Sequence, residues 1–423
     1  MQKSLDQKLA AIHADPAGAK DFIIADAKDA DMGFGISSPG KHRTADGVET
    51  RFRTLAEYRQ QIREIVEQGK VDIMLMSAST NDLLAHRERL FDNSQVTPAA
   101  RANDATDIFV VRGNHYVAEP SRPFRTAHID HIQCGHLDCK PEERARGTNL
   151  GLYSVTFNNR LDEDLRSLEA YSRFREEAER KGFRHFLEVF DPNAPQGLST
   201  DDIPKFVNDC IARSLAGVAQ AGRPVFLKVV YHGPRAMEEL VAYDPHLVVG
   251  ILGGGAGTTY DAFKLIAEAQ KYGARVALFG RKINNAENQL AFVEFLRLIV
   301  DRVISPEEAV RAYHGVLEKL RIKPQRRLDD DLRLQTAVMS YGGSASTVSV
   351  PGVMPGGRKA SNGTAPAHDC GCKAQAGACA CDTKPAGSAT SEASSDDAPD
   401  FSRMSVAEKL AWNKARRDRI FGT

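Results

Sequence analysis

Short apolar runs recur along the chain and alternate with longer segments in which apolar residues have a helical spacing. Runs of this length, rich in β-branched residues, are typical of strands buried on both faces. We expect eight strands, at residues 22–26, 71–77, 106–111, 150–157, 183–190, 224–231, 246–252 and 274–280.

Several segments between these runs have the pattern of amphipathic helices. Residues 54–69 carry an apolar stripe and end at a glycine, a common helix terminator. Residues 162–182 have the same stripe and also end at a glycine, and residues 260–273 and 286–301 are further amphipathic segments. Strand–helix alternation favours a parallel sheet, and eight such units predict an α/β protein with a (β/α)8 TIM barrel. An open doubly wound sheet is the alternative, although no Gly-x-Gly-x-x-Gly follows the first run.

The composition of the chain changes near residue 335. We expect residues 1–335 to form the barrel. Residues 336–400 are rich in Gly, Ala, Ser and Pro, contain two Cys-x-Cys pairs, and are expected to form a disordered linker. Residues 401–423 are expected to form a short helix, because Ser405 and Glu408 have the spacing of a capping box.

Composition and charge exclude several classes of protein. Lys plus Arg and Asp plus Glu both number 56, so nothing indicates a nucleic-acid or membrane-surface partner. No apolar run is long enough to span a bilayer, and the first residues lack a signal-peptide core, so we expect a cytoplasmic protein. Seven cysteines in 423 residues do not indicate a disulfide framework.

The run VFLKVVY places Lys228 inside an apolar strand, where an unpaired ammonium is costly to desolvate. A lysine amine shielded from water can instead act as a nucleophile, forming an imine that draws electrons from a neighbouring C–C bond. This chemistry needs a proton-transfer group. Glu188 is the first candidate, and Asp26 or Tyr153 the second.

Two turns have the composition of phosphate-binding loops. The seventh run is followed by Gly253, Gly254 and Gly255, and the eighth ends at Gly280 and Arg281. Backbone N–H groups in such turns bind anions, and phosphate sites after the last two strands recur in this fold.

These motifs together resemble the class I, Schiff-base aldolases of the (β/α)8 type, in particular the bacterial and archaeal fructose-bisphosphate and tagatose-bisphosphate aldolases. The resemblance rests on Asp26, FLEVF with Glu188, FLKVVY with Lys228, GILGGGAGTT, and ALFGRKI with Gly280 and Arg281. It spans roughly residues 20–320. It implies an aldehyde-lyase of carbohydrate metabolism with a Schiff base on Lys228, a phosphorylated sugar, ketose or aldehyde as substrate, no cofactor, and a homo-oligomeric state.

Two other functions stay open. In the first, Lys228 and Glu188 form a buried salt bridge in a non-catalytic barrel that serves as a scaffold or binding module. In the second, the loop at 115–139 holds the metal of a metal-dependent lyase. Its candidate ligands are His128, His131, Cys134, His136 and Cys139.

Residues 404–422 resemble the encapsulation peptides that recruit enzymes into bacterial microcompartments, in which a short helix follows a flexible linker. This resemblance implies a shell or partner protein that binds the helix, and a location inside a microcompartment as the alternative to the open cytoplasm. Docking of the helix on the barrel or on the oligomer, or binding of a basic tail to an acidic partner, would explain the same pattern.

Overall fold

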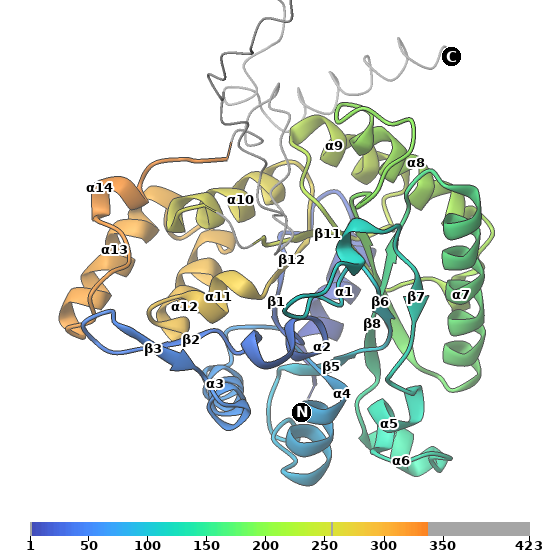
Figure 1. Cartoon of the computed structure of the whole chain (residues 1–423), viewed down its shortest axis with the longest axis horizontal. Coiled ribbons are helices and arrows are strands. Elements are labelled where there is room, and N and C mark those ends of the chain that lie inside the picture. The colour runs from blue at the N-terminus through green and yellow to red at the C-terminus, as the bar shows by residue number, and fades with distance from the viewer. Residues whose placement is uncertain (1, 255–256, 337–423) are drawn as a thin grey trace, which may run out of the picture. The chain divides into compact units, whose positions relative to one another are not determined.

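Eight parallel strands close into a barrel in the computed structural model, which describes residues 2–254 and 257–336 (Figure 1). The first strand pairs with β4 on one side and with β12 on the other, so the sheet has no free edge. The predicted (β/α)8 barrel is therefore confirmed. In order around the barrel, the strands are β1 (Ile23–Lys28), β4 (Ile73–Met76), β5 (Thr97–Arg101), β8 (Leu150–Thr156), β9 (Arg184–Phe190), β10 (Leu227–Val229), β11 (Val249–Leu252) and β12 (Val276–Phe279).

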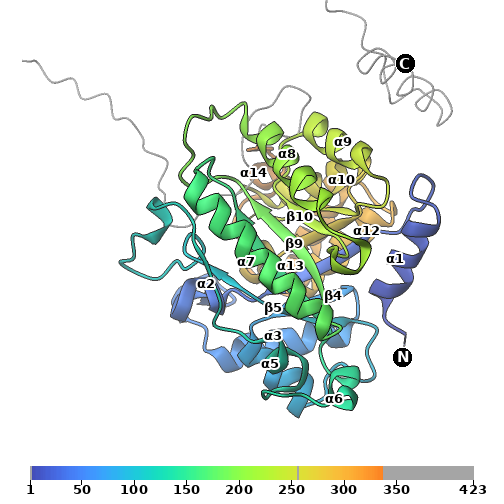
Figure 2. The same cartoon turned by 90° about the vertical axis from the view of Figure 1, so that its right-hand side faces the viewer.

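Helices surround the barrel, and Figure 2 shows the longest of those described, α7, lying across the outside of the sheet. A capping box at Thr54 and a left-handed Gly69 delimit α3, as its sequence predicts. The larger helices are α1 (Ser4–Ala14), α3 (Leu55–Gln68), α7 (Leu161–Arg180), α8 (Ile203–Ala216), α9 (Pro234–Tyr243), α10 (Thr259–Lys271), α12 (Gln289–Val300) and α13 (Pro306–Lys319).

Shorter elements lie in the connections between strands. Two antiparallel hairpins are formed by β2 (Lys41–Arg43) with β3 (Glu49–Phe52) and by β6 (Asp104–Ala105) with β7 (Pro123–Phe124). The short helices are α2 (Asp31–Phe34), α4 (Ala78–Asn81), α5 (Ile129–Cys134), α6 (Pro141–Arg146), α11 (Arg281–Asn285) and α14 (Leu328–Asp331). Single turns of other helix types occur at Gly35–Ser37, Asp82–Arg87, Tyr116–Ala118 and Gln220–Gly222.

The strands separate two hydrophobic clusters, because successive side chains of a strand point to opposite faces. The inner cluster fills the amino end of the barrel, where Leu5 and Leu9 of α1 pack with Ile23 and Phe226. The outer cluster joins the strands to the helices, as where Ile24 of β1 and Ile62 of α3 pack in the same cluster. The alternation thus decides whether a polar side chain on a strand faces the interior of the barrel or the helices.

The third strand differs from its prediction. The run at 106–111 follows β6 and is not a barrel strand, and the third strand of the barrel is β5. A short segment with Pro98 and two alanines has no branched apolar run and gives no strand signal. The apolar residues at 106–111 have other partners: Phe109 stacks on Tyr116, and Ile108 lines a cavity at the mouth of the barrel.

In residues 2–254 and 257–336, no helix is long and apolar enough to cross a membrane. The expected linker after residue 336 and the expected helix at 401–423 lie outside the described residues.

Candidate active site

A cavity of about 220 Å³ lies at the carboxyl ends of the barrel strands. Lys228 and Glu188 both line it. Their chain neighbours Leu227, Val229 and Leu187 belong to the outer cluster, so the alternation turns Lys228 and Glu188 inward. The cavity occupies the face of the fold where reactive groups of such barrels are found.

Lys228 and Glu188 form the closest charged pair in this cavity. The parallel register aligns the two residues across β9 and β10, and Lys228 Nζ lies 2.5 Å from Glu188 Oε1. The side chains are only 7% and 1% exposed. A charge-assisted contact of this length in a site shielded from water allows the proton to pass between the two groups.

The carboxylate of Glu188 is held by two further side chains. Ser154 Oγ donates a hydrogen bond of 2.5 Å to Glu188 Oε2, and Arg101 Nη2 lies 3.3 Å from the same oxygen. Arg101 also donates from Nε to Asp29 Oδ2 at 2.6 Å. Burial opposes the charge on Arg101, but Asp29 and Glu188 outweigh it and raise the pKa of the guanidinium. Arg101 therefore remains a fixed cation that orients Glu188 toward Lys228.

Asp107 supplies a further carboxyl group to the cavity lining. Thr156 Oγ1 donates to its Oδ2 at 2.6 Å, and Ser121 Oγ donates to its Oδ1 at 2.8 Å. Burial raises the pKa of Asp107 despite these two hydrogen bonds. A carboxyl group with a raised pKa is suited to general acid–base work near neutral pH.

A histidine–carboxylate pair stands beside these groups. Asp191 lines the cavity, and its Oδ1 lies 2.8 Å from His232 Nε2. The pair joins the ends of β9 and β10, so it fixes the position of both strand ends next to Lys228.

Four of the five residues expected to bind phosphate line the cavity: Gly253, Gly254, Gly280 and Arg281. The fifth, Gly255, lies outside the described residues. Gly254 has a left-handed φ of 59°, and a Cβ on Gly280 would lie 2.7 Å from the carbonyl oxygen of Ala27. Glycine adopts the left-handed φ of Gly254 readily, and at Gly280 it avoids the contact that a Cβ would make. Because neither residue has a side chain, the backbone at the cavity wall is accessible to a ligand.

Asp26 is not in the cavity, contrary to its prediction as a catalytic group. It shares the outward face of β1 with Ile24 and forms an ion pair with Lys28, with Asp26 Oδ2 3.0 Å from Lys28 Nζ. Both side chains are fully buried in the wall of the barrel. The strand that carries Asp26 was identified from the sequence, but β1 extends two residues beyond the expected end, to Lys28, and the face to which Asp26 points was not predicted.

Tyr153 likewise points away from the cavity, contrary to its prediction as a catalytic group. Its ring packs against Phe174 and Tyr171 of α7, with ring centroids 4.5 and 5.0 Å apart. Ser154, the next residue along β8, faces the interior instead. Tyr153 therefore belongs to the packing between barrel and helices.

The histidines and cysteines at 128–139 do not line the cavity. They extend from the N-cap of α5 through this helix into the connection to α6, at the lower right of Figure 1. Gln133 of α5 donates a hydrogen bond to the carbonyl of Lys181, just before β9 begins, so the segment is attached near the amino end of that strand. Cys134 and Cys139 are joined by a disulfide. The alternative of a metal-dependent lyase centred on this loop is not supported by this placement.

Sequence reasoning missed Arg101, Ser154 and Asp107. Arg101 ends β5, which gives no strand signal, and Asp107 lies inside the run at 106–111 that was expected to be the third strand, so neither stood at an expected strand end. Ser154 is adjacent to Tyr153, and the alternation along β8 would have distinguished the two had the inward face been known.

The fold and the cavity define a (β/α)8 barrel with a lysine–carboxylate pair at the carboxyl ends of its strands. No protein-family model matches the chain, and no curated protein matches it. Among solved structures, the chain is similar to a fructose-bisphosphate aldolase from Slackia heliotrinireducens DSM 20476, with a TM-score of 0.51 and 14% identity over 73% of this chain and 91% of the other. It is also similar to an archaeal fructose 1,6-bisphosphate aldolase, with a TM-score of 0.48 and 13% identity over 69% of this chain and 98% of the other. The similarity to the first of these shows that the chain has an aldolase-like fold.

Proposed function

We propose that the protein is a class I aldolase that cleaves or forms a C–C bond in a phosphorylated sugar through a Schiff base on Lys228. The observation that carries this proposal is the position of Lys228 Nζ, inside the cavity and 2.5 Å from Glu188 Oε1. A salt bridge that served packing alone would not need to face an open cavity. The aldolase-like fold adds support, although a fold alone does not determine a reaction.

In the first step, Glu188 accepts a proton from the ammonium group of Lys228, and the neutral amine adds to the substrate carbonyl carbon. The carbinolamine then loses its hydroxyl group as water, with the proton returned by Glu188, and an iminium ion remains. Arg101 and Ser154 hold Glu188 in place for both proton transfers.

In the second step, a base removes the proton from the substrate hydroxyl next to the bond that breaks. The electron pair of the C–C bond moves to the iminium nitrogen, so an aldehyde leaves and an enamine remains. Asp107 is the group we assign to this base, because it lines the cavity and burial raises its pKa. Protonation of the enamine and addition of water release the ketone and restore Lys228.

The phosphate of the substrate is assigned to the turns after β11 and β12. Gly253 and Gly280 bring backbone to the cavity wall, and Arg281 adds positive charge there. Burial lowers the pKa of Arg281, but an arginine stays charged at neutral pH.

Reductive trapping tests the proposal. The protein is incubated with dihydroxyacetone phosphate and borohydride, digested and examined by mass spectrometry. A stable adduct is expected on Lys228 and not on Lys28, the matched buried lysine of β1. If phosphorylated ketoses and aldehydes all leave Lys228 unmodified in folded protein, the Schiff-base mechanism is wrong and a non-catalytic binding barrel is favoured.

Asp107→Asn separates the two steps. The variant should still trap dihydroxyacetone phosphate on Lys228, but should cleave a ketose bisphosphate about 10²- to 10⁴-fold more slowly, the usual contribution of a general base. Loss of trapping in a folded Asp107→Asn protein would contradict the assigned division of roles.

A further inference from the structure

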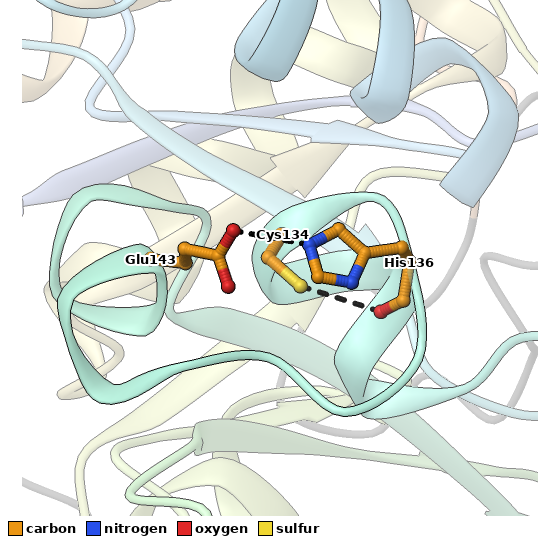
Figure 3. Close-up of side chains that lie close together, drawn as sticks. All are labelled: Cys134, His136 and Glu143. Carbon is orange, nitrogen blue, oxygen red and sulfur yellow. Dashed lines mark hydrogen bonds and ion pairs between the residues drawn. The ribbon is translucent and has the colours of Figure 1, made fainter.

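Four metal-binding side chains come together between α5 and α6, away from the proposed active site. Figure 3 shows Cys134, His136 and Glu143, whose ligand atoms all lie within 4.8 Å of one another. The fourth residue is Cys139, whose sulfur is bonded to that of Cys134 in the disulfide and therefore lies beside the same group of ligand atoms. The four residues come from a segment of ten residues, 134–143.

The two ligands other than sulfur are already oriented by their second polar atoms. The Nδ1 atom of His136 lies 2.7 Å from the carbonyl oxygen of Leu137 and donates to it, which directs Nε2 toward Glu143 Oε1 at 3.1 Å. The other oxygen of Glu143, Oε2, accepts a hydrogen bond from the backbone N–H of Lys140 at 2.8 Å. A histidine that donates its other ring N–H to a backbone carbonyl is the usual arrangement behind a metal-bound imidazole.

The carboxylate of Asp130 lies nearby but is already paired with two cationic side chains, so it does not compete with the four ligands for a metal ion. Asp130 is bound by Arg144 at 2.7 Å and by Lys181 at 2.9 Å. These ion pairs also fasten α5 to α6 and to the turn before β9. The segment that carries the four ligands is therefore held in place at both ends by α5 and α6.

We propose that the reduced protein binds a zinc ion through Cys134, Cys139, His136 and Glu143. Two sulfur ligands, one imidazole and one carboxylate give the tetrahedral coordination that zinc prefers, with sulfur atoms separated by roughly 3.8 Å for Zn–S bonds of about 2.3 Å. In the oxidised protein, the disulfide consumes both sulfur ligands, so zinc and the disulfide exclude each other.

Reduction of the disulfide has to precede zinc binding. A dithiol reductant breaks the Cys134–Cys139 bond, becomes a disulfide itself, and leaves two cysteine thiols. Zinc binding then releases the two thiol protons, because thiolates are the ligands. The site would hold α5 against α6 by a disulfide under oxidising conditions and by a metal under reducing ones. This inference does not rest on the proposed aldolase activity.

The test uses the full chain with Cys370, Cys372, Cys379 and Cys381 replaced by serine, so that tail cysteines cannot bind the metal. Protein reduced with dithiothreitol and freed of it without air should hold about one zinc per chain, and oxidised protein essentially none. Cobalt added in place of zinc should give a thiolate charge-transfer absorption in the reduced protein only.

Ligand variants make the result specific. His136→Ala and Glu143→Gln should each weaken zinc binding by about 10-fold or more, whereas the controls His128→Ala and Cys210→Ser should leave it unchanged. Both ligand side chains are exposed or half-exposed, so these variants should fold. Absence of zinc from the reduced protein, or equal zinc affinity in the ligand variants and the controls, would overturn the proposal.

Discussion

Two lysines are buried in strands of the same barrel, and each is paired with one carboxylate. Lys228 of β10 lies 2.5 Å from Glu188, and Lys28 of β1 lies 3.0 Å from Asp26. The first pair faces the cavity, where Arg101 and Ser154 hold its carboxylate. The second pair is fully buried on the outward face of its strand.

Position along a strand is therefore not enough to identify a reactive lysine. Burial raises the pKa of Asp26 and lowers the pKa of Lys28, so burial opposes both charges and each depends on its partner in the wall of the barrel. Neither residue of that pair lines the cavity, so we expect its role to be structural. A lysine becomes a candidate nucleophile when the alternation also turns it toward a cavity.

The largest expected effect comes from exchanging the two lysines for methionine one at a time. Lys228→Met should lower kcat/KM for retro-aldol cleavage by at least about 10⁴-fold, because the covalent intermediate cannot form. Lys28→Met should leave kcat within about threefold, since Lys28 touches no substrate. A coupled assay for the released triose phosphate measures both. Equal losses in two folded variants would remove the distinction between the pairs.

Glu188→Gln tests the carboxylate of the inner pair. The amide keeps the size of the side chain but cannot accept the proton of Lys228, so kcat should fall about 10²- to 10⁴-fold. Borohydride trapping should slow in parallel, as imine formation is the affected step. Unchanged trapping and turnover would show that Glu188 is only a packing partner.

Asp26→Ala tests the carboxylate of the outer pair. Removing one member of a buried ion pair leaves the other uncompensated and should cost about 3–5 kcal/mol of unfolding free energy. The double variant Asp26→Leu with Lys28→Met should recover most of that loss, because two apolar side chains can fill the same space. Denaturant unfolding of the full chain measures both. Wild-type stability in Asp26→Ala would mean that Lys28 gains access to water.

The sequence predicted the barrel better than it predicted the face of each strand. Seven of the eight predicted strands overlap barrel strands, because branched apolar runs such as that around Lys228 are strong signals. The exception is the run at 106–111. The barrel strand that was not predicted, β5, has a proline and two alanines and depends on its neighbours for strand structure. Tertiary pairing overrides a weak local preference in such a segment.

The same contrast between strand and face applies to the residues of the candidate site. Lys228 and Glu188 were predictable because a charge inside an apolar run is conspicuous and the alternation of their strands is regular. The prediction of Asp26 as a catalytic group was wrong because β1 extends to Lys28. The carboxyl end of the strand therefore lies farther along the chain, and Asp29 faces the cavity instead. Arg101 was not predicted as a site residue because β5, the strand that it ends, gives no strand signal in the sequence.

His185 of β9 is buried between the barrel and the helices, and it should make the stability of the protein depend on pH. The hydroxyl of Tyr171 is hydrogen-bonded to His185 Nε2 at 2.9 Å, and burial lowers the pKa of His185 to about 3. The folded-state pKa lies below the unfolded value of about 6.5, so the stability is present above pH 6.5 and is lost as pH falls toward 3. The loss contributed by His185 should be about 1.4 kcal/mol per pH unit. In His185→Phe this contribution should vanish, and parallel curves for the two proteins between pH 4 and 7 would contradict it.

The smallest effect is expected from Tyr153→Phe, which separates the two faces of a single strand. The ring packs between Tyr171 and Phe174 and would be kept, while only the hydroxyl is removed. Because Tyr153 points away from the cavity, kcat and KM should each stay within about twofold, the size expected when no transition-state contact is lost. Ser154→Ala on the same strand should instead lower kcat, since its hydroxyl holds Glu188. Steady-state kinetics of the two variants side by side give the comparison. A Tyr153→Phe protein that folds normally but loses most of its turnover would mean that β8 presents its other face to the substrate, and the inner and outer sides of the barrel wall would have to be reassigned.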